Sequence, residues 1–422
     1  MKKISLIIAM LVVISTGFAQ KRNVTSCWSF LKDGFYGDAK DAIDKATEHP
    51  DTKDWYKTWW YYGQTYQVLS TATKPKYQNL CDNCKVDAFN AYTKALVLNF
   101  EDEENRKLDL ENENDIVKFL TLIANQETKY EDNQALMDII GVRLPALSNG
   151  FVNEGVEHFQ ESEDFAKALE CFEYAIGAST LSFKVDTQIY YFASLAAKKA
   201  ENYAKAIEYN KALIRFKFGA NEEEKTGIYY NLAMCYKETG DTTKMLETLQ
   251  KGIDAYPEHS YNLIIETFNY YVNAGESEKA FEYISMAIEK NPNDPQFYVI
   301  KGTLLEDMNK KMEATKEYNK ALDLDPNNFD ANYSMGAFYY NSAADTLAWA
   351  NENIPPTDFK AYDEVKLASN ELFNLAVPYL EKCLELKDED LNVLNTLKTI
   401  YYRIGEIEKH DAVKAKLDAL VE

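Results

Sequence analysis

The strongest constraint on the fold is an internal repeat. Residues 261–294 and 295–328 are two adjoining copies of one pattern, each 34 residues long. Aligned end to end, the copies carry the same residue at matching places: Ala280 and Ala314, Ala287 and Ala321, and Pro292 and Pro326. A unit of this length cannot bury its apolar face alone and is stabilised by stacking on its neighbours. The sequence therefore predicts an array of helix pairs, each closed by a proline that cannot continue a helix.

The second copy resembles the tetratricopeptide repeat, in which two antiparallel helices cross closely. Lys301 is its one departure, at a position where the family has leucine. The resemblance implies an all-α fold, a right-handed superhelix (α-solenoid) of roughly eight helix-pair units, some with insertions. The residues that match the family pattern are Tyr298, Gly302, Leu305, Ala314, Tyr318, Ala321 and Pro326.

Less regular copies extend this organisation along the chain. They span 149–182, 187–220 and 226–260, and two further copies begin at 329 and 391. Near the N-terminus, Trp59, Tyr62, Gly63 and Tyr66 match the first helix of the family. The predicted domains are a signal peptide at 1–19, N-terminal repeats at 20–100, a charged helical bridge at 101–148, and a C-terminal superhelix at 149–422 with an inserted helical hairpin near 343–370.

The acidic run from Asp323 to Asp330 has a second interpretation, the oxygen ligands of a calcium-binding loop. Such a loop has glycine at its sixth position and glutamate at its twelfth. Counted from Asp323, those positions hold Asn328 and Ser334. The same segment recurs in register at 288–294. The run is therefore interpreted as the turn between two repeats.

Composition supports a helical chain and limits its partners. The 422 residues include only 16 glycines and 10 prolines, which are the residues that most often interrupt helices. The net charge of -22 disfavours nucleic acid and favours partners with basic segments. The alternative, that the acidity only maintains solubility, stays open.

Residues 1–19 have the pattern of a secretory signal peptide. Lys2 and Lys3 precede an apolar stretch, and small residues end it at Ala19, which predicts cleavage between Ala19 and Gln20. Cys27 lies too far from this point for a lipoprotein. Cleavage leaves 44 basic and 68 acidic residues, a net charge of -24.

No later segment is uniformly apolar over 18 residues, so we expect no membrane insertion after cleavage. The pattern predicts export to the periplasm of a Gram-negative bacterium, or secretion beyond it.

No known catalytic motif is evident. The sequence lacks a phosphate-binding glycine loop and a nucleophile elbow, and its four histidines are scattered. We therefore expect no enzyme activity, no catalytic residue, no cofactor and no metal site. Cys81 and Cys84 form a C-x-x-C motif. An oxidising compartment favours a local disulfide, while incidental thiols and a metal or redox role are the alternatives.

The family resemblance also implies a binding surface, because the first helix of each unit lines a concave groove. Tyrosine and asparagine dominate the carried-over positions, a composition typical of recognition surfaces, although solenoids expose some tyrosine in any case. The family's carboxylate clamp is not reproduced, so binding of chaperone C-termini is not implied. The predicted groove residues are Trp60, Tyr61, Tyr191, Lys198, Tyr230, Asn231, Asn269, Tyr333, Tyr340 and Tyr402.

Two functional hypotheses follow from these features. The first is an exported scaffold or adaptor of the cell envelope that binds partner proteins through the groove. The second is a glycan-binding protein that uses the groove aromatics as platforms for sugars. The lack of a lipid-attachment cysteine counts against the second, because glycan-binding proteins built on this repeat are commonly lipid-anchored.

Overall fold

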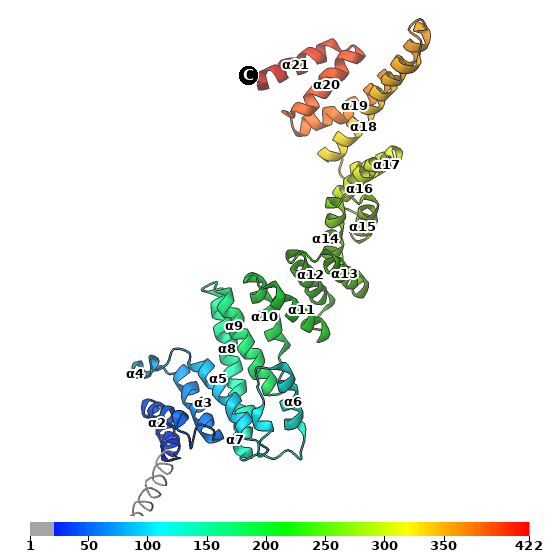
Figure 1. The fold of residues 1–422 in the computed structure, drawn as a ribbon. Coiled ribbons are helices and arrows are strands. Elements are labelled where there is room, and N and C mark those ends of the chain that lie inside the picture. Colours follow the sequence, from blue (N-terminus) through cyan, green and yellow to red (C-terminus); the bar gives the residue numbers. More distant parts are fainter. Residues whose placement is uncertain (1–20, 422) are drawn as a thin grey trace, which may run out of the picture. The chain divides into compact units, whose positions relative to one another are not determined.

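A computed structural model describes residues 21–421, and helices make up most of this range (Figure 1). The described residues contain no strand, and Phe100 and Tyr130 form an isolated antiparallel bridge. The predicted all-α solenoid is thereby confirmed. The predicted signal peptide, residues 1–19, lies outside the described residues.

The chain divides into two compact units. Unit 1 ends at Met245, and unit 2 begins at Leu246. The boundary lies inside the range 149–422 that was predicted as one superhelix, and the predicted bridge at 101–148 lies inside unit 1. Helix α13 (Thr242–Ala255) contains the boundary.

Unit 1 is built from successive helix pairs. Helix α3 packs on α5, α8 on α9, and α10 on α11. A helix over 21–33 precedes the others. The remaining elements are α2 (Tyr36–Glu48), α3 (Tyr56–Ser70), α4 (Pro75–Gln78), α5 (Cys84–Leu98), η1 (Asn105–Lys107), α6 (Glu113–Ala124), α7 (Asn133–Asp138), η2 (Ile139–Arg143), α8 (Leu144–Gln160), α9 (Phe165–Leu181), α10 (Thr187–Lys199), α11 (Tyr203–Arg215) and α12 (Glu222–Glu238).

Unit 2 continues the same arrangement. Helix α14 packs on α15, α16 on α17, α18 on α19, and α20 on α21. Its elements are η3 (Pro257–His259), α14 (Tyr261–Asn273), α15 (Ser277–Lys290), α16 (Pro295–Asp307), α17 (Lys311–Leu324), α18 (Phe329–Asn353), α19 (Phe359–Leu386), α20 (Leu391–Ile404) and α21 (Ile407–Val421).

Glycine marks the places where the two helices of a pair approach most closely. A Cβ atom added at Gly302 in α16 would overlap the ring of Tyr318 in α17. Buried aromatic or leucine side chains thus occupy the space that a larger residue would need. The same contact recurs in three other pairs: Gly63 with Tyr92, Gly155 with Phe172, and Gly336 with Leu380.

The segment 325–328 is the turn between α17 and α18. An Asp325 carboxylate oxygen accepts a hydrogen bond from the Asn327 backbone N–H at 3.0 Å. The Asn328 side chain accepts one from the Ala331 N–H at 2.9 Å and so caps α18. These side chains serve the turn between two repeats, in agreement with the sequence interpretation.

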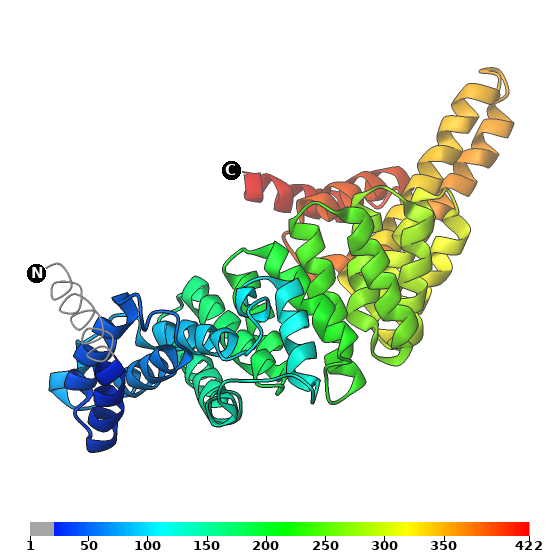
Figure 2. The same ribbon diagram turned by 60° about the horizontal axis from the view of Figure 1, so that its bottom comes forward.

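Helices α18 and α19 are the lengthened pair expected near 343–370, with 25 and 28 residues. Their ends, orange in Figures 1 and 2, extend beyond the other helices of unit 2. Ser369 Oγ donates a hydrogen bond to the Ala343 carbonyl at 2.9 Å in the buried part of the pair. Toward the connection at Pro355 and Pro356, large apolar side chains are exposed: Trp349, Phe359 and Leu367.

One helix among the described residues is long and apolar enough to cross a membrane. It spans Asn133–Gln160 and combines α7, η2 and α8. Polar residues interrupt the segment, so it is not the uniformly apolar stretch that the sequence prediction considered. Its residues Leu144, Leu147 and Phe151 are each at most 2% exposed in the core that α5 and α9 share. Core packing therefore accounts for part of its apolar composition, since 39% of the apolar window is buried, whereas Met137 and Val142 are exposed.

Candidate functional site

Helices α10 and α12 bring together part of the predicted groove in unit 1. Lys198 Nζ donates a hydrogen bond to Asn231 Oδ1 at 3.4 Å, which links the two helices. The Tyr191 ring stacks on Phe218, with 5.3 Å between ring centroids. These side chains and Tyr230 are half-buried. The surface of α10 and α12 thus combines aromatic faces with a charged and an amide group.

The predicted groove residues on α3 lie in a different environment. Trp60 is 9% exposed, and its Nε1–H donates to Asp138 Oδ2 at 2.8 Å. Tyr61 is half-buried and stacks on Trp60 with ring centroids 5.1 Å apart. The prediction that Trp60 belongs to an open groove is wrong. Its ring lies in the hydrophobic core of unit 1, and Asp138 of α7 accepts the hydrogen bond from its indole N–H.

The predicted residues of unit 2 differ in exposure. Tyr402 is 67% exposed beside His410, and Tyr333 is 36% exposed and stacks on Phe329. Asn269 is also exposed. Tyr340 instead packs half-buried against Phe373, a residue of the α18–α19 core. Three of the four predicted side chains in unit 2 are therefore available to a partner.

A cleft in unit 1 that the sequence did not predict as a site contains two adjoining cavities, of about 290 and 750 Å³. Both are lined by Ser70, Thr71, Lys85 and Gly150. The walls come from the end of α3, the segment 71–83, the start of α5, and α8, and α9 completes the larger cavity. We call this region the α8–α9 cleft.

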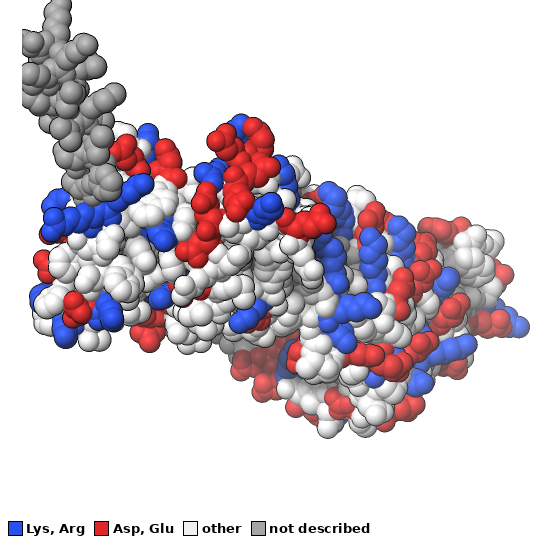
Figure 3. Space-filling model, turned by 90° about the horizontal axis from the view of Figure 1, so that it is seen from below, with Lys and Arg blue, Asp and Glu red and all other residues white. Residues whose placement is uncertain are grey.

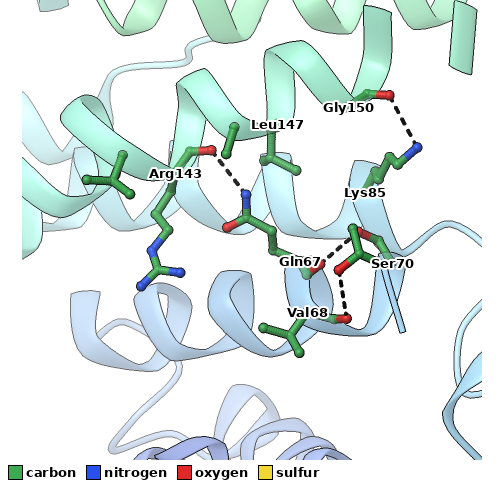
Figure 4. Close-up of a pocket in the computed structure, with 10 residues that line it drawn as sticks. Gln67, Val68, Ser70, Lys85, Arg143, Leu147 and Gly150 are labelled. Carbon is green, nitrogen blue, oxygen red and sulfur yellow. Dashed lines mark hydrogen bonds between the residues drawn. The ribbon is translucent and has the colours of Figure 1, made fainter. Parts of the chain in front are cut away.

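Hydrogen bonds hold the smaller cavity in shape (Figure 4). Gln67 Nε2 donates to the Arg143 carbonyl at 3.1 Å. Outside the view of the figure, Gln67 Oε1 accepts a hydrogen bond from the buried Tyr92 hydroxyl at 2.8 Å. Arg143 ends the π-helical segment η2, where the ordinary helical hydrogen-bond pattern is interrupted. Lys85 Nζ donates to the Gly150 carbonyl at 3.3 Å across the other side. The α3, α5 and α8 walls are thereby fixed to one another.

The larger cavity contains the chemically richer group of side chains. The Cys81–Cys84 disulfide lines it, together with Glu154, His158 and Cys171. The last three place one potential ligand atom each within 4.8 Å of one another. Burial, followed by the negative charges of Glu154 and Glu170, raises the pKa of the Cys171 thiol to about 12. This thiol therefore stays protonated at neutral pH unless a cation binds beside it.

The expectation of no metal site did not take in this cluster, because Glu154, His158 and Cys171 match no known metal-ligand motif. The signal that was present is the spacing of Glu154 and His158, four residues apart and so on one face of a helix. Cys171 lies on the next helix, and only the register of α8 against α9 shows that its thiol lies beside these two side chains.

Comparison with known families agrees with the helix pairs. Models of the tetratricopeptide repeat match residues 155–222 and 226–259, and a TPR-repeat model matches residues 302–342. The chain is a tetratricopeptide-repeat protein. Tetratricopeptide repeats identify the chain as a scaffold for protein–protein interaction.

Two relatives of this tetratricopeptide-repeat protein are mouse and human protein O-mannosyl-transferase TMTC3. Each is 26% identical, over 182 residues for the mouse protein and 178 for the human one. The matches cover 40% and 39% of this chain but only 19% of each relative. The chain therefore spans about a fifth of the relatives' length.

Solved structures of other tetratricopeptide-repeat proteins show partial likeness. The C-terminal part of a TPR repeat-containing protein from Cytophaga hutchinsonii is 17% identical with a TM-score of 0.44, and covers 64% of this chain and 95% of its own. MamA is 16% identical, with a TM-score of 0.35 over 46% of this chain and 89% of its own. YrrB, described as having an unusual peptide-binding site, is 14% identical, with a TM-score of 0.32 over 46% and 90%. Assignment to the family depends on the repeat matches.

Proposed function

We propose that this tetratricopeptide-repeat protein is an exported, non-enzymatic scaffold or adaptor of the cell envelope, which binds proteins through the first helices of its repeats. One observation carries the proposal: tyrosine, asparagine and lysine side chains on these helices reach solvent wholly or in part. Tyrosines on rigid helices offer contact area at low entropic cost. The residues concerned are Tyr191, Lys198, Tyr230, Asn231, Asn269, Tyr333 and Tyr402.

Export is supported by two independent features. Residues 1–19 have the pattern of a signal peptide. The Cys81–Cys84 disulfide is typical of an oxidising compartment. We expect the protein from a periplasmic fraction to begin at Gln20 when its N-terminus is sequenced. Recovery from the cytoplasm with Met1 and the following residues intact would contradict export.

The charge distribution favours basic segments in the partner. The net charge is -22, yet acidic and basic side chains are interspersed on the face drawn in Figure 3. Attraction to a basic partner is then expected to act mainly through the overall field. Such attraction is screened beyond about 8 Å at physiological ionic strength, so association is expected to slow as salt rises.

The test is crosslinking in native cells, followed by affinity measurements with each purified partner. Tyr333→Ala and Tyr402→Ala are each expected to weaken binding by about 1–2 kcal/mol with little change in melting temperature. Phe359→Ala is the control, because its ring is 75% exposed on the lengthened α18–α19 pair. If all variants bind the partner with equal affinity, the proposal that Tyr333 and Tyr402 contact the partner is refuted. Stabilisation by oligosaccharides, without any protein crosslink, would favour the glycan-binding alternative.

A further inference from the structure

We propose that Glu154, His158 and Cys171 form a binding site for a transition-metal ion of the zinc type in the α8–α9 cleft. The proposal goes beyond the protein-binding role and revises the expectation that the chain has no metal site. Carboxylate, imidazole and thiolate are the three side-chain ligands that zinc uses in proteins. Exposed acidic clusters do not have this composition.

Backbone geometry already holds the three ligands close together. Glu154 and His158 are four residues apart on α8, and Cys171 lies on α9, the helix packed against it. Their ligand atoms lie within 4.8 Å of one another. Zinc bond lengths of about 2.0–2.3 Å place two tetrahedral ligands about 3.3–3.7 Å apart. Small side-chain rotations, without movement of either helix, close this difference.

A neighbouring hydroxyl prepares the imidazole for metal binding. Ser162 Oγ lies 3.2 Å from His158 Nδ1 and donates its own proton to the His158 carbonyl, also at 3.2 Å. With this proton directed to the carbonyl, the hydroxyl oxygen is the acceptor for the His158 tautomer that carries its proton on Nδ1, and in that tautomer the lone pair for a metal is on Nε2. A hydrogen bond from the second ring nitrogen is the usual way in which proteins orient a ligating histidine.

The surrounding charges are mixed, and Lys85 is the main competitor. Lys85 Nζ donates to Glu154 Oε2 at 2.5 Å, which leaves Oε1 as the oxygen that this lysine does not bind. Lys167 also lines the cavity, as do the carboxylates of Glu157 and Glu170, which offset the two lysines.

Binding forms a metal–sulfur bond and releases the Cys171 thiol proton to water. No oxidant or reductant is needed for this step. Three protein ligands leave a fourth coordination position for a water molecule. The 750 Å³ cavity provides the room for that water.

The test uses the full mature chain with its disulfide intact and without reductant. Zinc binding is measured by competition with a fluorescent indicator, and Co²⁺ is added as a spectroscopic probe of cysteine ligation. We expect one Zn²⁺ per chain and a near-ultraviolet thiolate-to-cobalt band. Cys171→Ala should remove the band. Glu154→Gln, His158→Gln and Cys171→Ala should each weaken zinc binding more than about tenfold, since even outer-shell partners contribute that much.

Three controls separate this site from other sources of binding. Cys235→Ala removes a different buried cysteine of unit 1, and Glu161→Gln removes an exposed carboxylate just after α8 that lines neither cavity. Both are expected to bind zinc as the wild type does, with circular dichroism confirming that each variant is folded. Cys81→Ser with Cys84→Ser removes the disulfide from the cavity wall and is expected to retain stoichiometric binding, because neither sulfur is among the three ligands. The proposal is overturned if the wild type binds no stoichiometric zinc, if folded Cys171→Ala and His158→Gln bind normally, or if loss of Cys81 and Cys84 abolishes binding.

Discussion

At the scale of single residues, the departures from the repeat pattern have local structural explanations. Lys301 occupies a position where the family has leucine, and its Nζ lies 3.0 Å from Glu317 Oε1 on the partner helix. The two side chains are only 19% and 20% exposed. An ion pair between α16 and α17 thus replaces an apolar contact, and the Lys301 ammonium also lies 5.3 Å from the centroid of the Phe281 ring.

Removing only one member of this pair should destabilise the protein. Lys301→Leu leaves the Glu317 carboxylate poorly solvated and unpaired, so we expect a loss of about 1–3 kcal/mol in the free energy of unfolding. The double variant Lys301→Leu with Glu317→Leu should recover most of it, because apolar side chains replace buried pairs well. Urea denaturation of the four proteins in a double-mutant cycle gives the coupling. If the losses in unfolding free energy of the two single variants simply add in the double variant, the ion pair contributes nothing to stability.

The glycines at helix crossings give a second prediction. Gly302→Ala inserts a methyl group against the Tyr318 ring, and we expect a loss of about 1–3 kcal/mol from overpacking. Gly227→Ala in α12 is the matched control, because a Cβ there meets nothing within 4 Å. That change should raise stability by up to about 1 kcal/mol through helix propensity. Thermal unfolding of both variants checks the opposite signs, and a stabilised Gly302→Ala would disprove the close crossing.

At the scale of elements, the segment 71–83 connects α3 to α5. It contains the short helix α4 and leads to the Cys81–Cys84 disulfide at the start of α5. Tyr77 is an anchor, since its ring is 5% exposed and its hydroxyl donates to the Gly34 carbonyl at 2.9 Å. The disulfide therefore shapes one wall of the α8–α9 cleft more than it supports the fold.

Replacing both cysteines by serine should have a small effect on stability. A bridge across a gap of two residues removes little chain entropy, so we expect a change of about 1–2 kcal/mol, below the usual range for longer loops. Guanidinium denaturation measures it, and the wild type under reducing conditions should behave like the variant. Loss of all helical signal in the variant would instead show that these two residues hold the unit together.

At the scale of the whole molecule, the division into two units predicts unfolding that is not two-state. Four tryptophans, Trp28, Trp55, Trp59 and Trp60, belong to unit 1, whereas Trp349 belongs to unit 2 and is 56% exposed. Fluorescence therefore reports mainly on unit 1, while circular dichroism reports on all helices. Repeat arrays often lose cooperativity between distant parts. We expect urea transitions from the two probes to have different midpoints, and Trp349→Phe to leave the fluorescence midpoint unchanged. Coincident transitions would mean that the units unfold together.

The sequence by itself determined the elements whose cause is local. The 34-residue period, the prolines between copies and the small residues at helix crossings specify helix pairs, because each depends on neighbours within one unit. The turn after Asp323 could be distinguished from a calcium loop for the same reason. Several predicted surface residues, such as Tyr333 and Tyr402, are also exposed, since exposure on a first helix follows largely from its position in the repeat.

Only the tertiary structure decided what depends on contacts between distant segments. Trp60 follows the family pattern for a groove, yet Asp138, which binds it, lies 78 residues further along in a helix outside the repeat pattern. The candidate metal-ligand cluster likewise depends on the register of α8 against α9, which places Cys171 near His158, whereas the repeat pattern predicted only that the two helices pair. The repeat period predicts how a helix packs on its neighbour in the chain. A segment outside the repeats contacts residues that are distant in sequence, and no local sequence pattern predicts which residues those are.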